Sequence, residues 1–123
     1  MQFDDFLTRV QEQARLDTRD DAIRITQAVL ETLGERLDRK VRNGVEAQLP
    51  DELKEFLVAR AEHSDQYDLE QFYNRVGARA DLKYVDATEQ TREVLAVLRE
   101  AIPEGEIEDI LEDLPPEYRK LFS

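Results

Sequence analysis

The clearest structural signal in this chain is the stretch AIRITQAVLETLGERL, residues 22–37. Its apolar side chains and one threonine recur three and four positions apart, at Ala22, Thr26, Val29, Leu30, Leu33 and Leu37. That spacing places them along one face of an amphipathic α-helix. A β-strand would alternate with a period of two, and no segment does so for long enough. The sequence therefore predicts an all-α protein.

The same spacing recurs on both sides of this stretch. Further helical stripes occupy Phe3–Ala14, Val41–Leu49 and Leu53–Leu57. Residues typical of helix starts precede the helices: Thr18 or Asp20 before the long stripe, and Asp86-Ala-Thr-Glu89 as a capping box later in the chain. Pro50 is expected at the first position of its helix, where a missing N–H costs nothing.

The helical pattern begins a second time after a polar interruption at residues 63–68. The shift that aligns Phe6 with Phe72 also aligns Val10 with Val76, and a single deletion later in the chain then aligns Leu30 with Leu95, Leu49 with Leu114 and Pro50 with Pro115. We expect an internally duplicated helical bundle with three to four helices per repeat and a pseudo-twofold arrangement. Its parts are repeat one at 1–62, a linker at 63–68 and repeat two at 69–123.

Each repeat has about 60 residues, a size at which burial alone is marginal, so the two are expected to share one core. The equivalent residues Thr26 and Thr91 fall on the buried stripes. Their hydroxyls are expected to donate back to carbonyls of their own helices.

The chain is strongly acidic. Its 123 residues include 17 Lys plus Arg against 29 Asp plus Glu, a formal net charge of −12. This balance opposes nucleic-acid binding, which needs a cationic surface. Only four of the 17 basic residues are Lys. A composition with many acidic residues and few lysines is typical of proteins in concentrated salt, where the Debye length falls to about 3 Å. A GC-rich genome that favours Arg codons is the other explanation.

Composition also bears on location and chemistry. No stretch approaches the roughly 20 apolar residues of a membrane span, and Met1–Arg9 lacks the apolar segment of a signal peptide. We therefore expect a soluble, cytoplasmic protein without membrane contacts. The chain has no cysteine, which excludes disulfides, thiol catalysis and thiolate metal sites.

Several motifs resemble a known family. They are the run AVLETLGERL at 28–37, Gln48-Leu49-Pro50, Asp113-Leu114-Pro115 and Leu121-Phe122. Together they resemble the prokaryotic domain of unknown function family 2267, and the acidic composition resembles its salt-adapted archaeal members. The resemblance implies an all-helical, internally duplicated, soluble protein. It implies no activity and supplies no catalytic residues.

No residue pattern predicts catalysis or a cofactor. His63 is the only histidine, and it lies in the linker without a second ligand to complete a metal site. Residues 104–113 form an acidic run that contains Glu104, Glu106, Glu108, Asp109, Glu112 and Asp113. Clustered carboxylates suit hard divalent cations, so a carboxylate-based metal-binding protein or enzyme is an alternative function. A solvated acidic face is the preferred interpretation of the run, because on a helix these carboxylates point in several directions.

One feature is asymmetric between the repeats. Arg36, Arg39, Lys40 and Arg42 form a basic corner, whereas their counterparts in the second repeat fall in or next to the acidic run. Such a corner on an acidic protein is a candidate docking point for an acidic partner or for another copy of the chain. Neutralisation of nearby Glu35, Asp38 and Glu46 is the alternative. The predicted function is a non-catalytic interaction or self-association module with an unknown protein partner.

Overall fold

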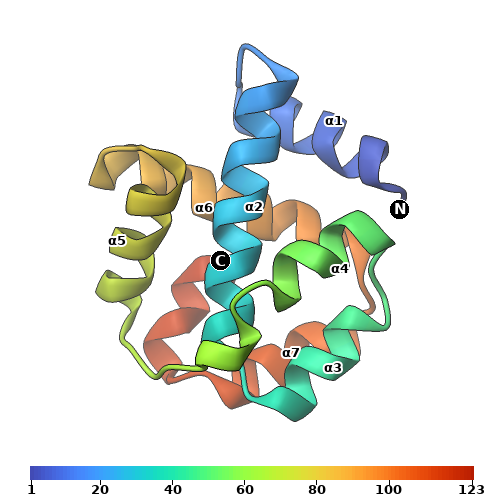
Figure 1. Ribbon diagram of the computed structural model, residues 1–123, viewed down its shortest axis with the longest axis vertical. Helices are drawn as coiled ribbons and strands as arrows, with labels where there is room; N and C mark the ends of the chain where they lie inside the picture. Colours follow the sequence, from blue (N-terminus) through green and yellow to red (C-terminus); the bar gives the residue numbers. More distant parts are fainter.

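The computed structural model describes residues 1–123 and is helical throughout (Figure 1). This confirms the predicted all-α class. The elements are α1 (Phe3–Gln13), α2 (Arg19–Arg36), α3 (Arg39–Glu46), α4 (Asp51–Val58), the 3-10 helix η1 (Ala61–His63), α5 (Leu69–Ala80), α6 (Tyr84–Ala101), α7 (Glu104–Asp113) and the 3-10 helix η2 (Pro116–Phe122). No helix combines the length and the apolar character that crossing a membrane would require.

Helix starts agree with the sequence in one place and differ in two others. Thr18 is the N-cap of α2, and its hydroxyl accepts from the backbone N–H of Asp21 at 3.1 Å. The capping box predicted at Asp86 is wrong, because α6 already begins at Tyr84. The reciprocal capping box instead lies at the start of α5, where Asp68 and Gln71 each bond the other's backbone N–H. Aspartate caps through its short acceptor, and glutamine reaches back.

Pro50 lies one position before the predicted place. It is the N-cap of α4, with an extended backbone (φ −65°, ψ 158°), and Asp51 is the first helical residue. Its carbonyl still accepts the first helical bond, from the N–H of Lys54 at 3.0 Å. The ring fixes φ at a value that an N-cap also tolerates, so the one-residue shift has no steric cost.

The helices of the two halves start at matching intervals. The starts of α1 and α5 are related by the shift that aligns Phe6 with Phe72. The starts of α2 and α6, of α3 and α7, and of α4 and η2 are related by the shift that aligns Leu30 with Leu95. The deletion in the sequence repeat therefore falls between the first and second helix of each half. The internal duplication stays a prediction, and this correspondence supports it.

Helix α2 is the centre of the molecule. It contacts α1, α4, α5 and α6, and in Figure 1 it runs down the middle with the other elements around it. Twelve of its 18 residues are buried, and from Ala28 to Arg36 every residue is, so the second half of the helix has no free face. Gly34 permits the closest approach, since a Cβ there would lie 1.7 Å from the carbonyl oxygen of Leu57 in α4. One cluster of 31 buried hydrophobic residues joins both halves.

The expected bonding of the two equivalent threonines is wrong. Thr26 and Thr91 are fully buried, as their position on the stripes predicts. Neither hydroxyl has a hydrogen-bond partner. The back-bonded threonines are instead Thr32, which donates to Ala28 O at 2.7 Å, and Thr88, which donates to Tyr84 O at 2.8 Å.

Candidate functional site

The structure divides the basic corner into two buried and two exposed side chains. Arg36 and Arg42 each retain 8% of their surface. Arg39 and Lys40 are exposed at the start of α3, and no carboxylate lies within 4.0 Å of either. The four cations therefore do not form one continuous surface.

Arg42 serves the end of α2. Its Nη1 donates to the carbonyls of Gly34 and Leu37, both at 3.3 Å, and its Nε lies 4.0 Å from Glu46. The last turn of a helix leaves carbonyls without internal partners and carries partial negative charge. Arg42 supplies hydrogen-bond donors and a positive charge at this helix end, so its side chain is not free to bind a partner.

Arg36 lies at the junction of the two halves. Its Nε donates to the carbonyl of Tyr67 at 2.9 Å, and its guanidinium lies 5.3 Å from the ring centre of Tyr118 and 6.0 Å from that of Tyr67. The Tyr118 hydroxyl donates to the same Tyr67 carbonyl. Burial raises the pKa of Tyr118 to about 12, against a smaller opposing effect of Arg36, so the phenol keeps its proton and donates. The two aromatic rings cover a cation that has no carboxylate beside it.

The acidic run forms α7, which packs along α3. Glu104 pairs with Arg99 at 2.6 Å, and Asp113 accepts from the backbone N–H of Asp38 at 2.9 Å. A groove of about 480 Å³ separates the two helices, lined by Lys40, Val41, Gly44, Glu106, Asp109, Glu112 and Asp113. The described residues contain no group of three or more His, Asp or Glu that could hold a metal ion. The geometry therefore gives the metal-binding alternative no support, and His63 is exposed on η1.

Sequence reasoning missed a network centred on Glu35, whose side chain is only 7% exposed. Its carboxylate accepts from Arg75 Nη1 at 2.8 Å, from Arg79 Nη2 at 3.1 Å and from the Tyr67 hydroxyl at 3.0 Å. Burial acts to raise the pKa of Glu35, but these hydrogen bonds outweigh it and lower the pKa below its ordinary value. Glu35 is therefore a buried carboxylate that stays ionised. It ties α2 of the first half to α5 of the second.

The segment that connects the two halves, residues 63–68, takes part in this network through Asp65 and Tyr67. Tyr67 is buried although its neighbours are polar, and its one hydroxyl proton is shared between Glu35 and Thr32 O, which lies 2.8 Å away. The Arg75 guanidinium lies 4.0 Å from the Tyr67 ring centre and donates to Asp65 at 2.8 Å. That hydrogen bond lowers the pKa of Asp65. The one aromatic residue within this polar stretch was the available sequence signal.

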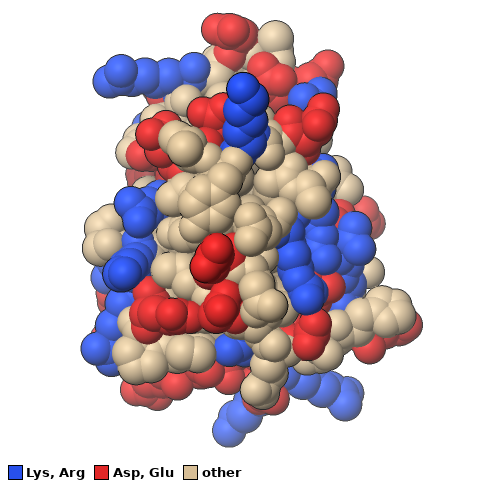
Figure 2. Space-filling model, turned by 90° about the vertical axis from the view of Figure 1, so that its left-hand side faces the viewer, with Lys and Arg blue, Asp and Glu red and all other residues tan.

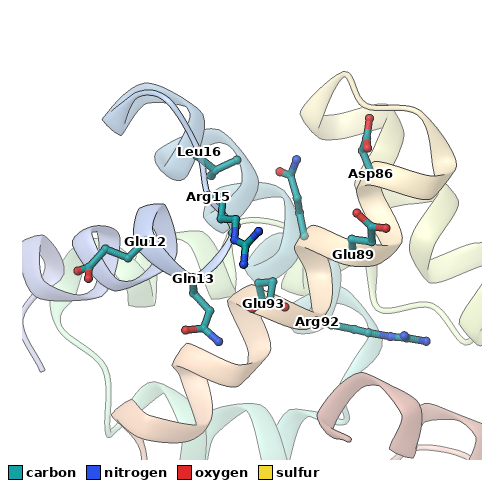
Figure 3. Close-up of a pocket in the computed structure, with 10 residues that line it drawn as sticks. Glu12, Gln13, Arg15, Leu16, Asp86, Glu89, Arg92 and Glu93 are labelled. Atoms are coloured by element: carbon teal, nitrogen blue, oxygen red, sulfur yellow. The ribbon is translucent and has the colours of Figure 1, made fainter.

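The largest cleft lies between the α1–α2 turn and α6 (Figure 3). Its volume is about 800 Å³, and most of its lining is charged or amide-bearing. Arg15 adopts a left-handed backbone (φ 56°), and Figure 3 shows its guanidinium reaching toward Glu93 while Arg92 extends away from the cleft. Arg15 and Glu93 are not within ion-pair distance, so the cleft holds both signs of charge without a fixed contact.

The side of the molecule that carries α5 has both kinds of charge around uncharged surface (Figure 2). Among the exposed large hydrophobic residues are Tyr84, at 47%, and Val85, at 65%, in the first turn of α6. The Tyr84 ring packs edge-on against Tyr73 at 5.9 Å. Two exposed residues make a small apolar area, which is ordinary for a protein surface.

Comparison with protein-family models gives a match. No curated protein matches the chain. A family model, described as "Uncharacterized conserved protein (DUF2267)", matches residues 3–121. That range includes every α-helix of both halves, the basic corner and the Glu35 network. The chain therefore belongs to the DUF2267 family, as the motifs at 28–37, 48–50, 113–115 and 121–122 predicted.

Proposed function

We propose that this protein is a non-catalytic interaction module that self-associates through the edge formed by α3 and α7. One observation carries the proposal: exposed, unpaired charges of opposite sign lie side by side on these two packed helices. Arg39 and Lys40 are at the start of α3, and Glu108, Asp109 and Glu112 are exposed on α7. None of the five has an ion-pair partner in its own chain.

A twofold axis makes such an edge self-complementary. In an isologous contact each copy uses the same surface, so α3 of one copy meets α7 of the other and the reverse. Arg39 and Lys40 then meet carboxylates of the partner copy. Arg36 and Arg42, which the sequence grouped with them, contribute nothing to this contact because they are buried and bonded within the chain.

Salt concentration controls whether the contact forms. Each copy carries −12, so long-range repulsion opposes association in dilute buffer. At about 1 M salt the Debye length is about 3 Å, and only charges in direct contact still interact. Opposite charges in contact then favour association while the net repulsion is screened. We expect the dimer fraction to rise from dilute buffer to molar KCl.

The test is light scattering coupled to size exclusion in molar KCl. Wild type should elute as a dimer at high protein concentration, and the double variant Arg39→Glu/Lys40→Glu should elute as a monomer. The matched control is Arg119→Glu/Lys120→Glu, an exposed Arg-Lys pair on η2 that undergoes the same charge change away from the edge. This control should dimerise as wild type does.

A mixing experiment identifies the partner surface. The variant Glu108→Lys/Asp109→Lys should be monomeric by itself, and mixing it with Arg39→Glu/Lys40→Glu should restore both charge contacts in a mixed dimer, one native and one with its signs reversed. A wild type that is monomeric at high concentration and molar KCl would overturn self-association. Retention of an acidic protein from cell extract by wild type, lost in Arg39→Glu/Lys40→Glu, would then assign the edge to a different partner.

A further inference from the structure

Arg36 has an unusual environment for a buried cation. It keeps 8% of its surface, yet no carboxylate lies within 4.0 Å, and its one side-chain hydrogen bond comes from Nε to Tyr67 O. A buried guanidinium that touches no carboxylate loses hydration that no direct ion pair replaces, and Asp65 acts on Arg36 only at longer range. The aromatic rings of Tyr118 and Tyr67 offset part of this cost. The guanidinium also acts on the Tyr118 hydroxyl, where it opposes the rise in that pKa, but neither terminal nitrogen makes a hydrogen bond within 3.5 Å.

Arg36 borders a pocket. It has a volume of about 360 Å³ and is lined by Arg36, Asp38, Ser64, Gln66, Asp113, Leu114 and Pro115. Three separate segments build it: the end of α2, the stretch between η1 and α5, and the end of α7. In Figure 1 the stretch before α5 passes along the lower end of the molecule, where the α7 segment also lies.

The walls carry both signs of charge. Asp113 accepts from the backbone N–H of Asp38 through Oδ2, and Asp38 accepts from the N–H of Lys40 through Oδ2. Each carboxylate bonds one backbone donor and has a second oxygen to offer. Ser64 and Gln66 add a hydroxyl and an amide, and neither side chain has a hydrogen-bond partner within the protein. Leu114 and Pro115 supply the apolar part of the wall.

We infer that this pocket binds a small zwitterion that carries a carboxylate and an ammonium group. The carboxylate pairs with the terminal nitrogens of Arg36, whose fork geometry matches two carboxylate oxygens. The ammonium binds the carboxylates of Asp38 and Asp113. A ligand with only one of the two charges meets attraction on one wall and repulsion on the other. The site shares Asp113 with the groove between α3 and α7, but it uses Arg36 and not the exposed Arg39 and Lys40 of the proposed dimer contact.

Titration of the 123-residue chain with ω-amino acids, followed by heteronuclear NMR, tests the inference. The probes are glycine, β-alanine, γ-aminobutyrate and ε-aminocaproate, which separate the two charges by increasing distances. Acetate and methylammonium carry one charge each. We expect saturable shifts of the Ser64 and Gln66 amide signals with at least one ω-amino acid, at affinities about tenfold or more above those for acetate and methylammonium.

Variants assign the two contacts. Arg36→Gln should weaken binding of the best probe by about 10- to 100-fold, since it removes a charged hydrogen-bonding partner. Asp113→Asn should lower the affinity toward that for acetate, while its amide oxygen can still accept from Asp38 N–H. The control is Arg24→Gln, which removes an exposed cation about three turns earlier in α2 and should leave the affinity unchanged.

The outcomes separate this site from the proposed function. Equal affinity for acetate and the ω-amino acids, or no saturable shift with any probe, overturns the zwitterion site. Unchanged binding in Asp113→Asn does so as well, even if Arg36→Gln fails to fold. Dimerisation of wild type is measured independently, and loss of the dimer in Arg39→Glu/Lys40→Glu says nothing about the pocket.

Discussion

Replacement of Glu35 by glutamine removes the negative charge at the junction of the two halves. In the native protein this carboxylate accepts from two guanidiniums and one phenol, and its side chain is 7% exposed. Glutamine keeps one acceptor oxygen but turns an NH₂ group toward Arg75 or Arg79. Those arginines lose their common counter-charge, while the fold continues to hold them near each other.

The cost follows from burial and the number of lost bonds. Breaking a buried ion pair by removing one partner costs about 3–5 kcal/mol. The Arg75 and Arg79 side chains are 32% and 16% exposed, so water recovers part of the loss. We expect Glu35→Gln to lower the free energy of unfolding by about 3 kcal/mol. With a urea m-value of about 1.5 kcal/mol/M, the unfolding midpoint falls by about 2 M.

Urea unfolding monitored by far-UV circular dichroism in molar KCl measures this change. The matched control is Glu104→Gln, which breaks the Arg99–Glu104 pair with side chains 42% and 56% exposed. An exposed pair contributes about 0.5 kcal/mol or less, so the control midpoint should stay near that of wild type. Equal midpoints for Glu35→Gln and Glu104→Gln would refute the conclusion that the Glu35 network holds the halves together.

Three further predictions concern acid, packing and salt. The pKa of Glu35 in the folded protein is lowered below the ordinary 4.5. The ionised carboxylate therefore stabilises the fold fully above the unfolded pKa, and this stabilisation is lost as pH falls through the folded pKa. Below pH 4.5 the free energy of unfolding should fall more steeply in wild type than in Glu35→Gln. Gly34→Ala should destabilise by about 3 kcal/mol, because its Cβ would meet Leu57 O at 1.7 Å. Gly105→Ala, with nothing within 4 Å of the added Cβ, should stabilise slightly, and thermal melts of both variants against wild type measure the two changes. If the acidic composition is a salt adaptation, helicity by circular dichroism should rise between dilute buffer and molar KCl; full, cooperative folding in dilute buffer would contradict it.

The helices and most of the core were predictable from the sequence. The residues of the stripe at 22–37, among them Leu30 and Leu33, are fully buried. The helix starts were less predictable, since Asp68 and Gln71 cap α5 while the similar sequence at Asp86 lies inside α6. A capping motif is a local pattern, and packing of the surrounding turns selects which of several such patterns begins a helix.

The burial and pairing of the charged residues, in contrast, could not be predicted from the sequence. Arg36, Arg39, Lys40 and Arg42 look equivalent in the sequence, yet two are buried and two are exposed. Arg36 ends α2, whereas the other three lie on α3. Arg39 and Arg42 are three positions apart on one helix and share a face, yet only Arg42 is buried, because it reaches back to the carbonyls at the end of α2. Nothing local to Glu35 shows that arginines 40 and 44 residues away will reach it.

Amino-acid order alone specified the class of fold, because an amphipathic helix depends on contacts between residues three and four positions apart. It also specified the net charge and the family motifs. Which charges pair, which remain free and where pockets open depend on contacts between distant segments. Arg36, Tyr67 and Tyr118 meet only because α2, the stretch before α5 and η2 converge at one end of the bundle. Burial at that point turns an ordinary basic residue into an unpaired cation beside a pocket, since the energy of a charge is set by its surroundings and not by its position in the chain.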